Sequence, residues 1–167
     1  MTRDEAWDLL CEHTKSESLR KHGLAVEAAM RRFARQNGGE DEETWAIAGL
    51  LHDCVPGPIE HAIQSHGDHT GVPRVTAMEK TLYAVDELCG FVTAVALVKP
   101  SKAVRDVDAR SVRKKMKDKA FARAVSRDMM LKGAEEMGVP FDDLISEVVR
   151  ALDDAALRLG LEGTTTT

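Results

Sequence analysis

The sequence predicts an all-α fold, and three observations support this prediction. Ala, Leu, Val and Met are plentiful while aromatic residues make up only 4% of the chain, a composition that favours helices over sheets. Apolar residues recur at helical spacing, as in residues 19–33 and 76–98. The sequence has no convincing alternation of β-branched residues and no hairpin turn. A length of 167 residues suits one domain, which we expect to span residues 1–163, with residues 164–167 as a disordered tail.

Start and stop signals divide the chain into its expected helices. Thr2 and Glu5 fit a capping box that opens the first helix, and either Ser16 or Ser18 caps the second. Glycine and proline residues break the chain between the later helices. The expected helices cover residues 2–13, 16–36, 41–53, 58–65, 76–98, 111–117, 118–137 and 141–159, with an alternative break of the seventh near residue 126. A polar loop is expected at residues 66–73.

The charge of the chain is uneven. The net charge is −5, which argues against general nucleic-acid binding. Residues 99–123 contain ten Lys or Arg and three Asp or Glu, a local net charge of +7, so the rest of the chain carries −12. This segment either attracts a small anion or a nucleotide phosphate, or forms an ordinary solvated helix face.

Cysteine usage and hydropathy indicate a cytoplasmic protein. The three cysteines, Cys11, Cys54 and Cys89, are odd in number and have no CxxC spacing, which argues against a disulfide framework or a structural zinc site. The sequence begins with no signal-peptide pattern, and no apolar run approaches the ~18 residues that a membrane span needs. We therefore expect a cytoplasmic location and no membrane association.

The dipeptide His52-Asp53 ends an apolar segment, residues 45–51. Burying such side chains without partners costs several kcal/mol, and a divalent cation is one way to satisfy both. Pairing with each other, or capping of the helix end, is the alternative. His22 on the second helix and Asp86 on the long helix add two more polar side chains beside apolar stripes, so three successive long helices can bring them to one point.

The order His22, then His52-Asp53, then Asp86 resembles the H…HD…D pattern of the HD superfamily of metal-dependent phosphohydrolases. The resemblance covers about residues 3–162 and extends to flanking segments. These segments are Gly71-Val72-Pro73, Asp86-Glu87-Leu88 with Gly90-Phe91, residues 98–102 and residues 111–115. The chain is similar to a bacterial subgroup of small, stand-alone HD-domain hydrolases.

This resemblance implies an HD-domain-like helical bundle around one divalent metal ion, which is Mn, Fe, Co, Ni, Zn or Mg. The implied metal ligands are His22, His52, Asp53 and Asp86. The implied reaction is hydrolysis of a nucleotide or another small phosphate ester, with Asp53 and His66 as catalytic residues. His66 is a general acid or a second-metal ligand in this interpretation, and an exposed loop histidine, like His61 and His69, in the alternative. The lysines Lys99, Lys102 and Lys115 are candidates for binding the phosphate.

The chain departs from the resemblance after the His-Asp pair. Residues 54–58 join the pair directly to the following helix, so the bundle is expected to be shortened at this point. Loss of a packed helix disfavours a second metal ion. It also exposes apolar surface on the neighbouring helices, which predicts a homodimer in which two copies cover this surface, either side by side or by exchanging helices.

Two alternatives to the hydrolase stay open. In the first, the shortened cleft has lost the metal chemistry and serves another enzymatic role or binds a nucleotide cofactor through the basic segment 99–123. In the second, the protein is a non-catalytic helical dimer in which the buried polar side chains pair only with one another.

Overall fold

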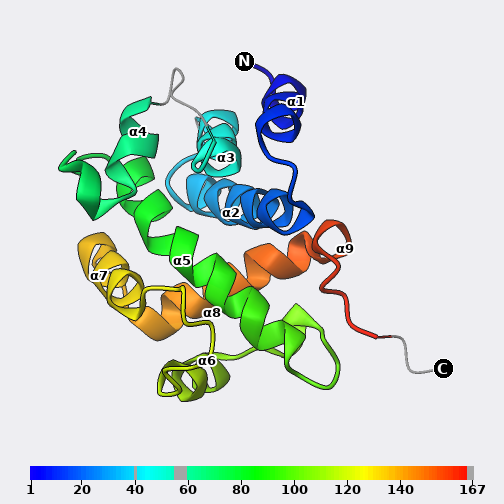
Figure 1. Ribbon diagram of the computed structural model, residues 1–167. Helices are drawn as coiled ribbons and strands as arrows, with labels where there is room; N and C mark the ends of the chain where they lie inside the picture. Colours follow the sequence, from blue (N-terminus) through cyan, green and yellow to red (C-terminus); the bar gives the residue numbers. More distant parts are fainter. Residues whose placement is uncertain (40, 55–59, 165–167) are drawn as a thin grey trace.

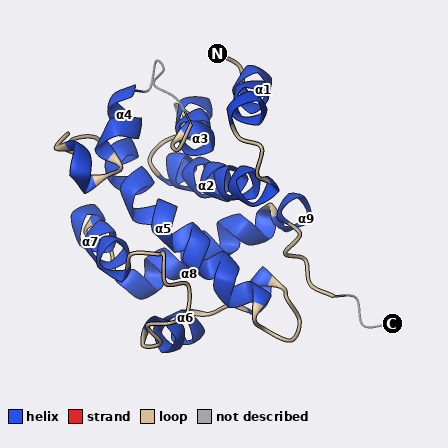
Figure 2. Ribbon diagram, viewed as in Figure 1, coloured by secondary structure: helices blue, strands red, loops and turns tan. Residues whose placement is uncertain are grey.

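The computed structural model describes residues 1–39, 41–54 and 60–164, and helices dominate them (Figures 1 and 2). The described part of the chain contains no β-strand; Ala103 and Glu162 form an isolated antiparallel bridge. The elements are α1 Arg3–His13, α2 Glu17–Gln36, α3 Glu42–Leu51, α4 Glu60–Ser65, η1 Asp68–Thr70, α5 Ala77–Leu97, η2 Val104–Asp106, α6 Ala109–Met116, α7 Arg127–Met137, α8 Phe141–Asp154 and α9 Ala156–Leu159. The all-α prediction is confirmed.

The N-terminal half follows the sequence signals closely. Thr2 and Glu5 form the predicted capping box of α1, and of the two candidate serines it is Ser16 that caps α2. The expected helix at 58–65 is α4, which begins at Glu60. Residues 55–58, where the chain is predicted to be shortened, lie outside the described residues.

The C-terminal half departs from prediction at two helices. The expected helix 118–137 is not continuous, and the alternative with a break near residue 126 is confirmed: residues 118–125 form turns, Ser126 caps α7, and α7 begins at Arg127. The guanidinium of Arg127 donates to the carbonyls of Asp118, Phe121, Ala122 and Val125, and it thereby ties these turns to the start of α7. The expected helix 141–159 is divided at residue 155 into α8 and α9.

Two further boundaries differ from the expected ones. Asp108, rather than Ser111, caps α6, and Ser111 is instead its capping-box partner. Thr164 belongs to the predicted disordered tail, yet its backbone N–H donates to the carbonyl of Ser101 at 2.8 Å. The rest of that tail, residues 165–167, lies outside the described residues.

Helix α5 crosses the middle of the molecule, with α2 on one side and α7 on the other, and α8 passes behind it (Figure 1). Apolar side chains from these helices form one core, and Met30, Leu82, Phe91, Met130 and Leu144 are fully buried in it. Burial of these apolar side chains is the main stabilising contribution to such a fold. No helix in the described part of the chain is long and apolar enough to cross a membrane.

Helices α2 and α3 approach so closely that glycine is needed on α3. A Cβ atom on Gly49 would lie 2.8 Å from Cγ of Met30 and 2.9 Å from the carbonyl oxygen of Val26, closer than real contacts allow. Gly23 meets the same limit from the α2 side, since its Cβ would lie 2.9 Å from the carbonyl oxygen of Leu50. This approach brings the C-terminal end of α3 next to the first half of α2.

A buried carboxylate ties α1 to α2. Glu27 is 1% exposed and accepts hydrogen bonds from two guanidinium groups, that of Arg3 at 3.0 and 3.1 Å and that of Arg31 at 3.2 Å. A buried charge is tolerated when it is paired and hydrogen-bonded in this way.

Candidate metal centre

Three polar side chains from three parts of the chain meet between α2, α3 and α5. His22 comes from α2, His52 follows the last residue of α3, and Asp86 comes from α5. Nε2 of His22 donates to Oδ1 of Asp86 at 2.9 Å, and Nε2 of His52 lies 3.2 Å from the same oxygen. The ligand atoms of the three residues all lie within 4.8 Å of one another.

The His52 ring is oriented by the backbone of its own helix. Nδ1 donates to the carbonyl oxygen of Gly49 at 2.7 Å, so Nε2 is the ring nitrogen that faces the centre. This nitrogen is buried, and its 3.2 Å contact with Asp86 does not have hydrogen-bond geometry. Within the described residues it therefore has no hydrogen-bond partner, which is unusual for a buried polar atom and makes this nitrogen a candidate metal ligand.

The arrangement fits a divalent cation. Neighbouring ligand atoms around an octahedral cation with bonds of about 2.1 Å lie roughly 3 Å apart. The two distances from Oδ1 of Asp86, 2.9 and 3.2 Å, are close to this spacing. Two imidazoles and a carboxylate suit Mn, Fe, Co, Ni or Zn.

Asp86 and His52 hold each other in charged states. Burial by itself lowers the pKa of His52, but the adjacent Asp86 carboxylate outweighs burial and raises this pKa to about 9. Burial also disfavours the ionised form of Asp86, yet the contacts with His22 and His52 hold its pKa far below the usual range. Without a metal, His52 is therefore protonated at neutral pH, and a cation has to displace that proton.

Asp53, the fourth predicted ligand, lies beside the centre but outside the tight group of three. Its Oδ2 is 3.4 Å from Nε2 of His52, its Oδ1 is 3.8 Å from Nε2 of His66, and its side chain is 57% exposed. His66 donates from Nδ1 to the carbonyl of Ile63, which directs Nε2 toward Asp53. The structure thus places both predicted catalytic residues next to His52, with ring centroids of His52 and His66 5.5 Å apart.

The two other histidines of this region, His61 in α4 and His69, do not join the centre. Nδ1 of His61 donates to the carboxylate of Glu79 at 2.8 Å, and the His61 side chain is 57% exposed. His69 belongs to the exposed 3-10 helix η1, where its ring lies against Gly67.

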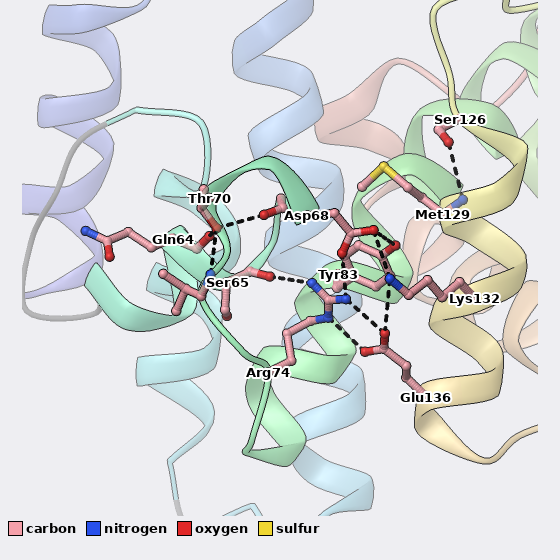
Figure 3. A network of polar contacts seen from close by, with 12 residues as sticks. Gln64, Ser65, Asp68, Thr70, Arg74, Tyr83, Ser126, Met129, Lys132 and Glu136 are labelled. Carbon is pink, nitrogen blue, oxygen red and sulfur yellow. Dashed lines mark hydrogen bonds and ion pairs between the residues drawn. The ribbon is translucent and has the colours of Figure 1, made fainter.

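The segment that carries His66 is fixed by one guanidinium group (Figure 3). Arg74 donates to the carbonyl of Ser65, to Asp68 and to Glu136, each at 2.8 Å. Its guanidinium carbon lies 3.6 Å from the centroid of the Tyr83 ring, in cation–π contact. Arg74 therefore joins the segment 65–74 to α5 and α7.

Asp68 completes this network. It accepts hydrogen bonds from Lys132 at 2.9 Å, from Arg74 at 2.8 Å and from the Tyr83 hydroxyl at 3.1 Å (Figure 3). The Lys132 and Arg74 contacts lower the pKa of Asp68 to about 2. The network is not predictable from the sequence, because Glu136 is 62 residues from Arg74 and no local pattern joins them.

A pocket of about 850 Å³ opens directly beside the centre. Its walls come from α2, α5, the turn at residues 124–125 and the chain at residues 159–161, and Figure 1 shows α9 beside the start of α2. His22, Asp53 and Asp86 form part of the wall. A small molecule in this pocket can therefore reach three of the four candidate metal ligands, while His52 is buried and does not line the pocket.

Lys99, Lys102 and Lys115, predicted to bind phosphate, are not among the described residues that line this pocket. Lys99 and Lys102 lie in the turns that follow α5, and Nζ of Lys115 lies 4.7 Å from the centroid of the Phe121 ring.

Lys21 lines the pocket in their place, and it was missed from the sequence. Its Nζ lies 2.9 Å from Oε1 of Glu17, one helical turn earlier. No local pattern selects it, because adjacent helix positions point about 100° apart and do not share a face.

Two histidines and an aspartate from successive long helices, beside an open pocket, define an all-helical protein with a candidate divalent-metal centre. The chain belongs to the HD domain family, because the model of that family matches residues 19–127, more than half of its length. The match contains all four predicted ligands and confirms the resemblance identified from the sequence. Neither the curated proteins nor the solved structures include a match to this chain. HD domains typically bind divalent metals, in agreement with the side chains brought together here.

Proposed function

We propose that the protein is a metal-dependent phosphohydrolase that acts on a small phosphate ester, nucleotides included. The observation that supports this proposal is the meeting of His22, His52 and Asp86 at one end of a pocket large enough for such a molecule. These three side chains would hold one divalent cation, and Asp53 would be its fourth protein ligand or act beside it. A cation held there lowers the pKa of water and offsets negative charge on a phosphoryl group.

The residues around the centre have distinct roles in this proposal. Asp53 presents a half-exposed carboxylate to the pocket and accepts a proton from the attacking water. His66 faces the other oxygen of that carboxylate at 3.8 Å and passes the proton onward. Lys21, at the pocket wall, replaces the lysines proposed from sequence as the cation that attracts the phosphate.

Metal analysis combined with a matched pair of variants tests the proposal. Protein purified without added metal, and then supplied with Mn²⁺, should carry one ion per chain and hydrolyse p-nitrophenyl phosphate. Asp86→Asn should abolish both properties, while Asp142→Asn, at a half-exposed aspartate outside the centre, should keep both. Failure of the wild-type protein to take up any divalent metal overturns the proposal.

One observation favours the non-catalytic alternative. The 2.9 Å hydrogen bond from His22 to Asp86 satisfies both groups without a metal. In that case His52→Ala changes stability alone and no hydrolysis is detected in the wild-type protein. The cofactor-binding alternative depends on the basic segment 99–123, and it requires binding of a nucleotide that survives a chelator and Asp53→Ala. The homodimer and the cytoplasmic location remain predictions, which sedimentation and cell fractionation test.

A further inference from the structure

Apolar side chains form most of the pocket wall away from the candidate metal centre. Leu19 and Leu97 are 55% and 50% exposed, although burying a leucine side chain away from water is favourable. A ligand that covers both side chains would be stabilised by this burial. The apolar wall consists of Leu19, Leu97, Ala124, Val125, Leu159 and Leu161.

Cationic groups are scarce in the same pocket. Among the described residues that line it, Lys21 is the single Lys or Arg, and its Nζ is paired with Glu17 at 2.9 Å. Three further acidic residues, Asp53, Asp86 and Glu87, lie at the end that holds the candidate metal ligands. Lys21 can offset the charge of one phosphate group in this pocket. Further phosphate groups of a polyphosphate would lie against carboxylates, with no further Lys or Arg among the described lining residues to bind them.

Resting on the proposed function, we propose that the substrate is a phosphate monoester whose organic part is apolar, such as an alkyl chain or an unsubstituted aromatic ring. The single phosphate lies at His22, His52 and Asp86, and the organic part lies against Leu19, Leu97 and the other apolar side chains. Nucleoside polyphosphates are poor substrates, because their extra negative charges would lie against Asp53, Asp86 and Glu87. Sugar phosphates are poorer substrates than apolar esters, because most of their hydroxyls would cover leucine side chains, and Ser18 and Thr93 are the two hydroxyl side chains among the described lining residues. In the reaction the oxygen of water bonds to phosphorus as the ester P–O bond breaks, a water proton ends on the released alcohol, and nothing is oxidised or reduced.

The substrate preference of the Mn²⁺-loaded protein provides the first test. We expect kcat/KM for 1-naphthyl phosphate and hexyl phosphate to exceed that for glycerol phosphate and ATP by about tenfold or more. 1-Naphthyl phosphonate, which is not hydrolysed, should bind with measurable heat in titration calorimetry, and a hydroxyalkyl phosphonate should not bind.

Two neighbouring positions supply a matched pair of variants. Leu97 lines the pocket, whereas Val98, 55% exposed, is not among its lining residues. Leu97→Asn should lower the ratio of kcat/KM for naphthyl phosphate over glycerol phosphate by about tenfold. Val98→Asn should leave this ratio and both rates unchanged, and both variants change an exposed position that the fold tolerates.

The possible outcomes separate this inference from the proposed function. Metal uptake with hydrolysis of glycerol phosphate or ATP as efficient as that of naphthyl phosphate overturns the apolar-substrate inference and leaves the hydrolase standing. An equal effect of Leu97→Asn and Val98→Asn on the ratio also overturns it. Absence of both metal uptake and hydrolysis overturns the two proposals together.

Discussion

Nε2 of His22 and Oδ1 of Asp86 lie 2.9 Å apart, although 64 residues separate them in the chain. Their meeting depends on the packing of α2 against α5, and it places a hydrogen-bonded carboxylate in front of the buried ring of His52. This contact is the basis of both the metal proposal and the stability of the metal-free centre.

Replacing Asp86 by Asn removes the negative charge that contacts both His22 and His52. The buried imidazolium of His52 then keeps the half-exposed carboxylate of Asp53, 3.4 Å away, as counter-charge in place of the buried one, so we expect the metal-free variant to lose about 3 kcal/mol of unfolding free energy. Urea unfolding measures this change. Asp142→Asn, which removes a surface ion pair with Arg113, should cost less than about 1 kcal/mol, and equal losses in the two variants would contradict the buried-pair interpretation.

The raised pKa of His52 predicts how the stability of the metal-free protein varies with pH. The pKa is about 9 in the folded state and about 6.5 in the unfolded state, so the folded state binds this proton more tightly. The resulting stabilisation is complete below pH 6.5 and is lost as pH rises through 9. Urea unfolding of chelator-treated protein from pH 6 to 9.5 should show this loss, and it should be absent in His52→Gln.

Metal binding should follow the opposite trend over the same range. Because a cation displaces the proton of His52, its affinity should rise with pH until that proton has gone. Titration calorimetry with Mn²⁺ in buffers of different ionisation enthalpy reports the released proton directly. Binding without proton release at pH 7 would show that His52 is not a ligand.

Gly49→Ala tests whether the close approach of α2 and α3 shapes the centre. The added methyl group would collide with Met30 and with the backbone of Val26, so we expect a loss of about 2 kcal/mol and weaker metal uptake. Gly90→Ala is the matched control, since a Cβ there finds its nearest atom, in the His22 ring, at 3.9 Å. That variant should gain about 0.5–1 kcal/mol from helix propensity, measured by thermal unfolding. An equal loss in Gly90→Ala would contradict the packing interpretation, because helix propensity favours alanine at both positions.

Arg74→Ala tests the network that fixes the segment 65–74. The change leaves Asp68 and Glu136 without their guanidinium partner and removes the cation–π contact with Tyr83, so we expect a loss of about 3 kcal/mol. Amide hydrogen exchange should become faster in residues 65–74, which include His66. Arg35→Ala breaks an exposed pair with Glu42 and should leave exchange there unchanged. Unchanged exchange in Arg74→Ala would show that other contacts fix this segment.

The sequence by itself determined the helical class, most helix boundaries and the residues of the centre. Caps such as Thr2 and Ser16 act through hydrogen bonds within one turn of helix, so a local pattern is enough to predict them. His22, His52 and Asp86 could be predicted to meet because polar side chains on apolar helix faces need partners, and because their order resembles that of a known family.

Tertiary structure alone decided the features that depend on distant contacts. The segment of His66 is held by Glu136 and Lys132 from α7, which contact Arg74 and Asp68 across 62 and 64 residues of sequence. The wall of the pocket likewise combines α2, α5 and residues 159–161. Such arrangements depend on which helices pack side by side, and helical periodicity specifies the face that each helix buries but not the neighbour that covers it.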